Sequence, residues 1–311
     1  MEIALQFVLL ALGFVMLGKG ADWFVEGAAG IAMRFGIPQL VIGLTIVAMG
    51  TSAPEAAVSI AAAVKGNADI TIGNIVGSNL FAYHGLATLS ALAASIVPIA
   101  VARSTVRIEI PFMIGVTALL FYQGRDSSIS LADGGVLMVA FAAYMMYLYT
   151  MAMKSNVDSD LEEPGLPLGR CLLGAVGGLV LIIAGSNVTV GAATSIATYA
   201  GLSERFIGLT IVALGTSLPE LFTSVAAARR GNADIAIGNI VGSNIFNILF
   251  VVGLSSLIID IPFASAFNFD TYVALGAAVL LWLCVLRTQR LQRWAGALML
   301  MCYVAYLGYI L

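Results

Sequence analysis

Long hydrophobic runs separated by short polar breaks fill this chain from end to end. Each run is long enough to cross about 30 Å of hydrocarbon as a helix. The first run lacks a basic start and a small-residue cleavage site, so we expect a membrane helix there rather than a signal peptide. The pattern predicts an all-α membrane protein with ten transmembrane helices, at residues 2–33, 39–64, 70–97, 104–122, 130–152, 166–198, 204–228, 235–259, 269–287 and 294–311.

Composition supports a bilayer location and excludes other classes. The chain is 60% hydrophobic and 10% charged, whereas soluble domains are about a quarter charged. Its net charge is -3 and its longest basic run is Arg229–Arg230, so nucleic acid is not expected as a partner. We therefore expect a multi-pass protein of the inner (plasma) membrane whose surroundings are the lipid bilayer.

Two segments of the first half of the chain recur in the second half, both at the same spacing. The segment IGLTIVAMGTSAPE (42–55) recurs as IGLTIVALGTSLPE (207–220) with two differences, and GNADITIGNIVGSN (66–79) recurs as GNADIAIGNIVGSN (231–244) with one. Such self-similarity predicts a duplicated unit. A hydrophilic break rich in acid, Gly and Pro, 154–167, is the expected linker between a first five-helix repeat at 1–153 and a second at 168–311.

The odd number of spans per half predicts that the second repeat is inverted relative to the first. Basic residues favour cytoplasmic loops, and ten of them fall on one predicted face against three on the other. This predicts a cytoplasmic linker and both termini outside. The ten are Arg34, Arg103, Arg107, Lys154, Arg170, Arg229, Arg230, Arg287, Arg290 and Arg293, and the three are Lys65, Arg125 and Arg205. Inverted repeats are typical of secondary transporters, with the substrate site at the repeat interface near mid-bilayer.

Glu55 and Glu220 occupy the same position of the two repeats, about midway along their hydrophobic runs. A carboxylate at that depth is costly and needs a compensating partner. A protonated glutamic acid that hydrogen-bonds a neighbouring helix is one solution. Two carboxylates related by a repeat favour another, a shared cation, and with added carbonyl oxygens they form a hard ligand set suited to Ca²⁺.

A proline directly precedes each glutamate, at Pro54 and Pro219. A proline inside a helix removes an amide donor and clashes with the preceding turn. We expect the backbone to open here and to present carbonyl oxygens to an ion, because irregular backbone at this depth is tolerated where it lines a cavity. The carbonyls concerned are those of Ala48, Thr51, Ala213 and Thr216.

The second repeated element, GNIVGSN, brings Ser78 and Ser243 to the next span, where their hydroxyl groups are expected to face the ion site. Its glycines favour close helix packing. Elsewhere, Lys19, Asp22 and Glu26 have spacings that permit mutual ion pairs on one helix, and a role in the ion path is an equal alternative for them. A catalytic metal site is not expected at the lone histidine, and the scattered cysteines are expected in apolar packing.

At GTSAPE/GTSLPE and the twofold GNIVGSN the chain resembles the sodium/calcium exchanger family of the calcium/cation antiporter superfamily, whose paired alpha repeats these are. The resemblance covers essentially all ten predicted helices. It implies that Glu55 and Glu220 coordinate Ca²⁺ together with backbone oxygens of Thr51 and Thr216. It also implies that the first and sixth helices slide as a unit against the rest, and that flanking Na⁺ sites include Ser52, Ser78, Ser217 and Ser243.

One position departs from the family pattern. Four residues after the GSN serine, relatives place an amide in the first repeat and an acid in the second, where this chain has Ala82 and Asn247. Asn247 keeps an oxygen at the candidate site but no charge. With two central carboxylates, one Ca²⁺ balances the site, whereas three Na⁺ would leave a net positive charge in a low dielectric. The counter-ion and the stoichiometry therefore stay open at this point.

The sequence thus predicts a secondary active antiporter that exchanges Ca²⁺ for Na⁺ by alternating access. The alternative is exchange of Ca²⁺, or another divalent cation, for protons, which carboxylates are able to carry. A channel would need a continuous polar pore, often formed by an oligomer, and the internal repeat in a single chain argues against it. No enzyme-type nucleophile–base pair, prosthetic group or obligate protein partner is expected.

Overall fold

The computed structural model describes residues 2–66, 68–83, 99–154, 167–201 and 213–310. Within these ranges the chain is almost entirely helical. The first half contains α1 (Glu2–Phe35), α2 (Gln39–Ile42), the π-helical turn η1 (Gly43–Val47), α3 (Ala48–Thr51), α4 (Ala53–Val64), α5 (Asp69–Phe81), the π-helical turn η3 (Thr105–Glu109), α7 (Ile110–Gln123), the 3₁₀ turn η4 (Gly124–Asp126) and α8 (Leu131–Lys154). The second half contains α9 (Leu168–Tyr199), α11 (Ala213–Thr216), α12 (Leu218–Arg229), α13 (Ala233–Phe246), the π-helical turn η7 (Asn247–Val252), α14 (Gly253–Ile258), α15 (Ala266–Leu286) and α16 (Arg293–Ile310).

Six stretches of the described chain are long and apolar enough to cross a membrane, namely Ile3–Phe35, Thr105–Asp126, Leu131–Lys154, Leu168–Tyr199, Ala233–Ile258 and Ala266–Leu286. A seventh candidate is the pair Gln39–Thr51 and Ala53–Val64, which is bent by 51°. The all-helical membrane class is therefore confirmed. The predicted spans 70–97 and 204–228, most of the linker 154–167, Arg205 and His84 lie partly or wholly outside the described residues. The count of ten spans stays a prediction.

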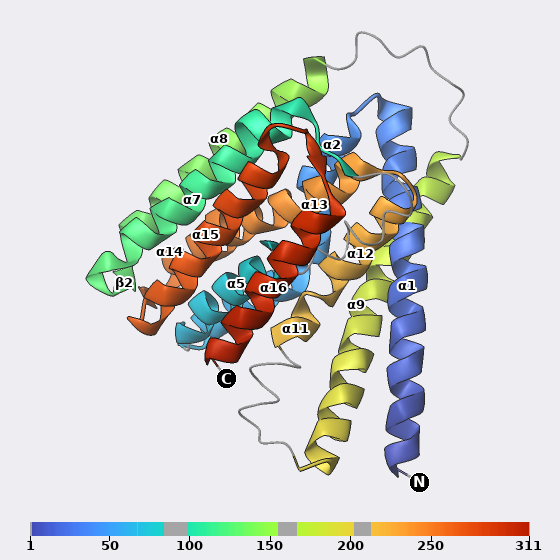
Figure 1. Cartoon of the computed structure of the whole chain (residues 1–311), viewed down its shortest axis with the longest axis horizontal. Helices are drawn as coiled ribbons and strands as arrows, with labels where there is room; N and C mark the ends of the chain where they lie inside the picture. The colour runs from blue at the N-terminus through green and yellow to red at the C-terminus, as the bar shows by residue number, and fades with distance from the viewer. Residues whose placement is uncertain (1, 67, 84–98, 155–166, 202–212, 311) are drawn as a thin grey trace.

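Helices α1 and α9 form a long pair along one edge of the molecule, beside a bundle made by the other helices (Figure 1). Their contact is close because glycines face each other across it. A Cβ added to Gly178 would lie 2.6 Å from the carbonyl oxygen of Gly20 and 2.5 Å from the backbone nitrogen of Phe24. Side chains at these positions would force the helices apart, so the glycines allow the two backbones to touch.

Four short strands join the two halves of the chain in pairs. β1 (Ile99–Ala100) pairs antiparallel with β4 (Arg290–Leu291), and β2 (Ser128–Ile129) pairs antiparallel with β3 (Ile261–Pro262). The register matches Ile99 with Leu291 and Ile129 with Ile261. The same shift in numbering takes β1 to β3 and β2 to β4, so the two bridges have the equivalence expected of a two-fold related pair.

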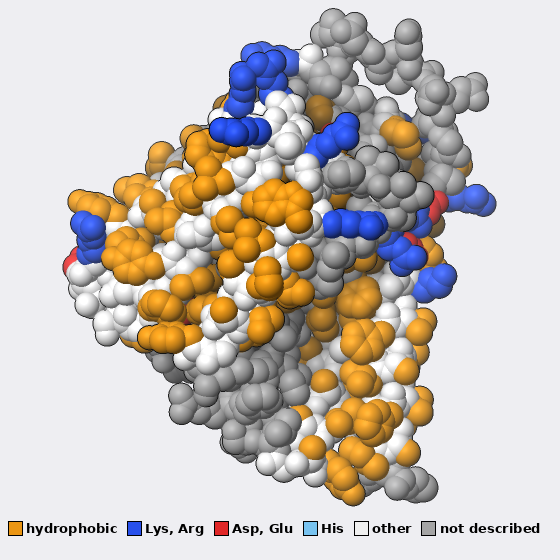
Figure 2. All heavy atoms as spheres, viewed as in Figure 1, with side chains coloured by type: hydrophobic (Ala, Val, Ile, Leu, Met, Phe, Trp, Pro, Cys, Tyr) orange, Lys and Arg blue, Asp and Glu red, His pale blue; other side chains and the backbone are white. Residues whose placement is uncertain are grey.

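The molecular surface has a largely hydrophobic middle, and most of the Lys and Arg side chains in view gather toward one end (Figure 2). At the end of α12, Arg230 places Nε 3.5 Å from Asp22 Oδ1 and Nη1 3.0 Å from Glu26 Oε2, both on α1. Among the ion pairs of the described residues none involves Lys19. The predicted pairing within α1 is therefore wrong, because a cation from another helix reaches both acids.

Candidate functional site

Each repeated glutamate lies in the first turn of a half-helix that begins just after a break. Glu55 is in the first turn of α4, after Ser52 with φ -82° and ψ 8°, and Glu220 is in the first turn of α12, after Ser217 with φ -91° and ψ 6°. Pro54 in α4 and Pro219 in α12 each lie within the first two positions of their helix, where the missing amide hydrogen costs no helical hydrogen bond. The N-terminal end of a helix also stabilises negative charge. The proline break therefore creates two places that suit a buried carboxylate.

The serines at the two breaks reach across to the opposite repeat. Ser52 Oγ donates a hydrogen bond of 2.8 Å to Glu220 Oε1, and Ser217 Oγ lies 3.4 Å from Glu55 Oε1. A serine three residues before a glutamate has the spacing of a capping box, yet neither serine caps its own helix. Ser78 Oγ lies 3.2 Å from Glu55 Oε1 and 2.9 Å from Ser217 Oγ. The structure therefore brings both glutamates and three predicted serines into one cluster.

An asparagine from the next helix buttresses each glutamate. Asn239 Nδ2 donates to the backbone oxygen of Glu220 at 3.2 Å and to Ser224 Oγ at 2.8 Å. The same two bonds occur at the equivalent position of the first repeat, from Asn74 Nδ2, at 3.2 and 2.9 Å. These bonds fix the half-helix that carries the carboxylate against its neighbour in both repeats.

Two further predicted residues reach the cluster through Asn239. Thr51 Oγ1 lies 3.0 Å from Asn239 Oδ1 and 3.3 Å from the carbonyl oxygen of Ala48, and Ser243 Oγ lies 3.5 Å from Asn239 Oδ1. Among the described residues Ser243 thus bonds no carboxylate, unlike its counterpart in the first repeat. Thr216 is partly buried at the end of α11, and Ala213 begins that helix.

The two residues that depart from the family pattern are also buried beside the cluster. Asn247 Nδ2 donates to Asn79 Oδ1 at 3.1 Å, and Asn79 Nδ2 donates to the backbone oxygen of Asn244 at 3.3 Å. Asn247 Oδ1 has no hydrogen-bond partner within the described ranges, and Ala82 contributes a methyl group. An amide network therefore stands where a third carboxylate would add charge.

Each central carboxylate keeps one buried oxygen without a partner, Glu55 Oε2 and Glu220 Oε2. Their residues are 0% and 2% exposed. The described residues contain no group of three His, Cys, Asp or Glu side chains arranged to hold a metal ion. The described oxygens gathered here are two carboxylates and the hydroxyl groups of Ser52, Ser78 and Ser217, and oxygen ligands of this kind suit a hard cation such as Ca²⁺.

Some supporting residues were not assigned to the site from the sequence. Ser59 and Ser224 follow the two glutamates by four residues in both repeats, and this repeated spacing was a usable signal. Ser186 Oγ on α9 donates at 2.7 Å to the Gly215 carbonyl, which the following proline leaves without its helical amide partner. The equivalent of Ser186 in the first repeat is Ala21, so the repeat gave no signal for this contact.

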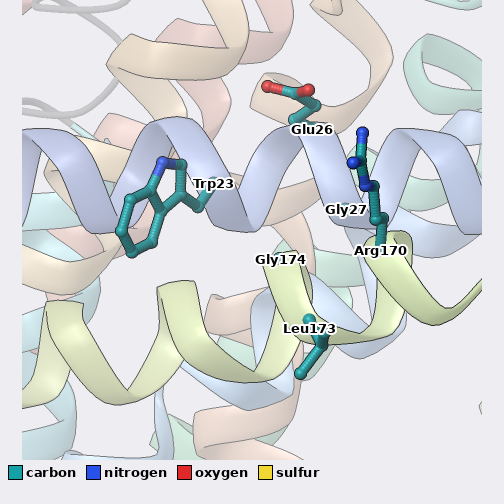
Figure 3. A pocket seen from close by; sticks show the side chains of 6 residues that line it. All are labelled: Trp23, Glu26, Gly27, Arg170, Leu173 and Gly174. Atoms are coloured by element: carbon teal, nitrogen blue, oxygen red, sulfur yellow. The ribbon is translucent and has the colours of Figure 1, made fainter. Parts of the chain in front are cut away.

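A surface hollow of about 400 Å³ lies between α1 and α9, away from the predicted site residues (Figure 3). It is lined by Trp23, Glu26, Gly27, Arg170, Leu173 and Gly174. None of these residues belongs to the repeated motifs. The hollow is therefore not the site formed by the two glutamates.

Comparison with known proteins points in one direction. The model of the family described as sodium/calcium exchanger protein matches residues 5–150 and 171–311. The chain is 33% identical to sodium/calcium exchanger MaX1 of Methanosarcina acetivorans, covering 98% of both chains, and 34% identical to inner membrane protein YrbG of Escherichia coli, covering 96% of this chain and 95% of that protein. A solved structure of the sodium-calcium exchanger NCX_Mj, soaked with Na⁺ and Sr²⁺, matches with a TM-score of 0.84 at 31% identity over 98% of this chain and 99% of that one.

Proposed function

Because the chain belongs to the sodium/calcium exchanger family, we propose that it is a secondary active antiporter that exchanges Ca²⁺ for Na⁺ by alternating access. The observation that carries the proposal is the pair of buried glutamates, each bonded to a serine of the opposite repeat and each retaining one unpartnered oxygen. One Ca²⁺ between Glu55 and Glu220 would neutralise both charges. MaX1 and NCX_Mj are named as sodium/calcium exchangers, and these names support Ca²⁺ and Na⁺ as the two exchanged ions.

The proposed Ca²⁺ ligands are the two glutamates and carbonyl oxygens at the helix breaks, those of Thr51, Thr216, Ala48 and Ala213. The serine hydroxyls beside the carboxylates form the proposed Na⁺ sites, with Ser52, Ser78, Ser217 and Ser243 as members and Asn247 as an additional amide oxygen. Ser243 joins this set through Asn239. This division follows from ligand chemistry, because Ca²⁺ takes six to eight oxygens with carboxylates among them.

The architecture that goes with this function is a pair of inverted five-helix repeats, 1–153 and 168–311, joined by a linker at 154–167. Two observations support the repeat relation. The asparagine bonds recur at equivalent positions of the two repeats, and the strand pairs exchange partners between the halves. The excess of basic residues on one predicted face supports a cytoplasmic linker and outside termini.

Proton exchange is the second candidate, because the amide at Asn247 leaves the site with two carboxylates. With two carboxylates the site carries a charge of -2, which two protons neutralise as well as two Na⁺ do. The chain lacks the third acid that would bind a further cation. Glu55 and Glu220 would then each carry one proton in the returning state.

The experiment that separates these candidates is Ca²⁺ uptake into proteoliposomes under an outward Na⁺ gradient, an outward proton gradient, or neither. Uptake driven by Na⁺ supports the first proposal, and uptake driven by protons alone supports the second. Glu220→Gln is the site control, because it removes one charge without changing the size of the side chain. Uptake that persists unchanged in this variant would contradict the site assignment for both candidates.

A further inference from the structure

A third carboxyl group is buried outside the central site. Among the described residues the buried acids are Glu55, Glu220 and Glu109, and Glu109 is 0% exposed. It ends η3, the π-helical turn that opens the span Thr105–Asp126. π-Helical turns are rare and are found frequently at functional sites. An ionisable residue inside a membrane span is itself a reason to look for a function.

The surroundings of Glu109 satisfy only half of its carboxyl group. Tyr147 on α8 donates its hydroxyl to Glu109 Oε1, and the Ser104 hydroxyl also interacts with the carboxyl group, whereas Glu109 Oε2 is buried with no geometrically aligned hydrogen-bond partner among the described residues. Tyr144, one turn earlier on α8 and 5% exposed, interacts electrostatically with Glu109, and its own hydroxyl oxygen has no partner. Thr105 Oγ1, at the other end of η3, is likewise buried and unpartnered. Among the described residues, Glu109 Oε2 and the Tyr144 hydroxyl beside it are therefore both left without a hydrogen-bond partner.

No described Lys or Arg forms an ion pair with Glu109. Other titratable groups lie on the elements around η3. On α8 these are the tyrosine hydroxyl groups, and next to Glu109 in the chain they are the exposed Arg103 and Arg107. On α15 they are Cys284 and Arg287, which follow the Trp282 contact to η3. That contact is a 2.8 Å hydrogen bond from Trp282 Nε1 to the carbonyl oxygen of Val106. The neighbours that touch the carboxyl are thus neutral donors.

A bare negative charge in this position would be strongly unfavourable, because a buried charge needs a paired cation or several hydrogen bonds. A metal ion is a poor solution, since Ca²⁺ takes six to eight oxygens and only one carboxyl group is present. A proton removes the charge with a single ligand atom. A proton on Oε2 also creates a donor, and one water between it and the Tyr144 hydroxyl would satisfy both open atoms.

We propose that Glu109 is a proton-binding site, separate from the ion-exchange site, and that its proton keeps η3 packed against α8. Helix α8 continues from Tyr144 to Phe141, whose ring lies 6.1 Å from Phe246 and 5.2 Å from Phe250, on either side of Asn247. Loss of the proton would therefore loosen a contact next to the turn that borders the central cluster. This proposal does not depend on which ions the central site exchanges.

Infrared difference spectroscopy on the purified protein tests the bound proton directly. Wild type minus Glu109→Gln is expected to show the C=O band of a protonated carboxylic acid at neutral pH, and the band should vanish on alkaline titration. Glu55 and Glu220 cancel in this difference. Glu26→Gln is the matched control, because Glu26 is exposed beside Arg230 and should give no such band. A Glu109→Gln difference without the band at neutral pH overturns the proposal.

Two further measurements test the hydrogen bond and the packing. Tyr147→Phe removes the donor to Oε1, so the band should move to higher frequency, and an unmoved band would contradict the assignment to Glu109. The melting temperature of the wild-type protein should fall more steeply with rising pH than that of Glu109→Gln, because the glutamine keeps the site neutral at every pH. Equal falls in the two proteins would overturn the proposed role of the proton in packing.

Discussion

Membrane potential is expected to have no effect on exchange by the wild-type protein and a large effect on Asn247→Asp. The central cluster contains two carboxylates, so one Ca²⁺ or two monovalent cations neutralise it, and a full cycle moves no net charge. A third carboxylate at position 247 allows three monovalent cations to load for each Ca²⁺, and the cycle then moves one charge. A potential of about 100 mV contributes about 2.3 kcal/mol per charge, equivalent to about a 50-fold change in the equilibrium Ca²⁺ ratio.

The structure shows which contacts this substitution changes. Asn247 is 2% exposed and donates its amide to Asn79 Oδ1. An aspartate would face that oxygen with another acceptor, so the Asn79 amide must turn over and donate instead. Asn79 would then lose its 3.3 Å bond to the Asn244 carbonyl. The lost hydrogen bond costs about 1 kcal/mol, and the buried aspartate charge must be compensated by the additional cation that the variant is expected to load.

The assay uses proteoliposomes in which a K⁺ gradient and valinomycin set the potential while the Na⁺ or proton gradient is held constant. The steady-state ratio of Ca²⁺ inside to outside is measured at zero potential and at both signs of potential. Asn247→Ala is the control for loss of the amide network, and like wild type it should give the same ratio at every potential. A wild-type ratio that follows the potential would refute the charge count on which the prediction rests.

Three other changes have defined outcomes. Glu55→Gln and Glu220→Gln each leave one central charge, so Ca²⁺ uptake should be abolished while size-exclusion chromatography still shows a folded protein. Gly238→Ala would place a Cβ 2.9 Å from the backbone at the start of η1 and should cost about 1–3 kcal/mol of stability by overpacking. The melting temperature of this variant should therefore fall. Gly276→Ala is the control, because its Cβ meets no described atom within 4 Å and should not lower the melting temperature. Arg230→Ala removes two partly exposed ion pairs, with Asp22 and Glu26, and should change stability by no more than about 1 kcal/mol for each pair. A larger loss in denaturant titration would argue that Arg230 anchors α1.

The parts of the fold that hydrophobic pattern predicts well are the uninterrupted helices. The run predicted at 166–198 is α9, Leu168–Tyr199, and the run at 130–152 is α8, Leu131–Lys154. The run at 39–64 was expected to open near its proline, but the structure divides it into four segments with a bend of 51°. Hydropathy reports whether a stretch is apolar and not how its backbone turns, so neither η1 nor the bend angle was available from the sequence.

The candidate site was predictable where the same polar residues occur at equivalent positions of both repeats. Glu55, Glu220 and the serines stood out because nearly identical motifs occur in both halves of the chain. The hydrogen-bond partners of these side chains could not be predicted from the sequence. Ser52 has the spacing to cap its own helix, and only the tertiary structure shows that it donates to the opposite glutamate. A sequence repeat identifies equivalent residues, whereas contacts between the repeats depend on how the two halves pack.

Equivalent residues also differ in their bonds, and this difference is informative about mechanism. Ser78 hydrogen-bonds Glu55 and Ser217, whereas within the described part of the chain its counterpart Ser243 hydrogen-bonds the amide oxygen of Asn239 and no carboxylate. Two repeats with nearly identical motifs have the same intrinsic preferences, so unequal bonding must come from how the halves are arranged. In transporters built from inverted repeats, one half moves against the other around a fixed site. If the repeats are inverted as proposed, exchanging these two arrangements would convert one access state into the other, and the unequal serines are then the local sign of a structure in a single access state.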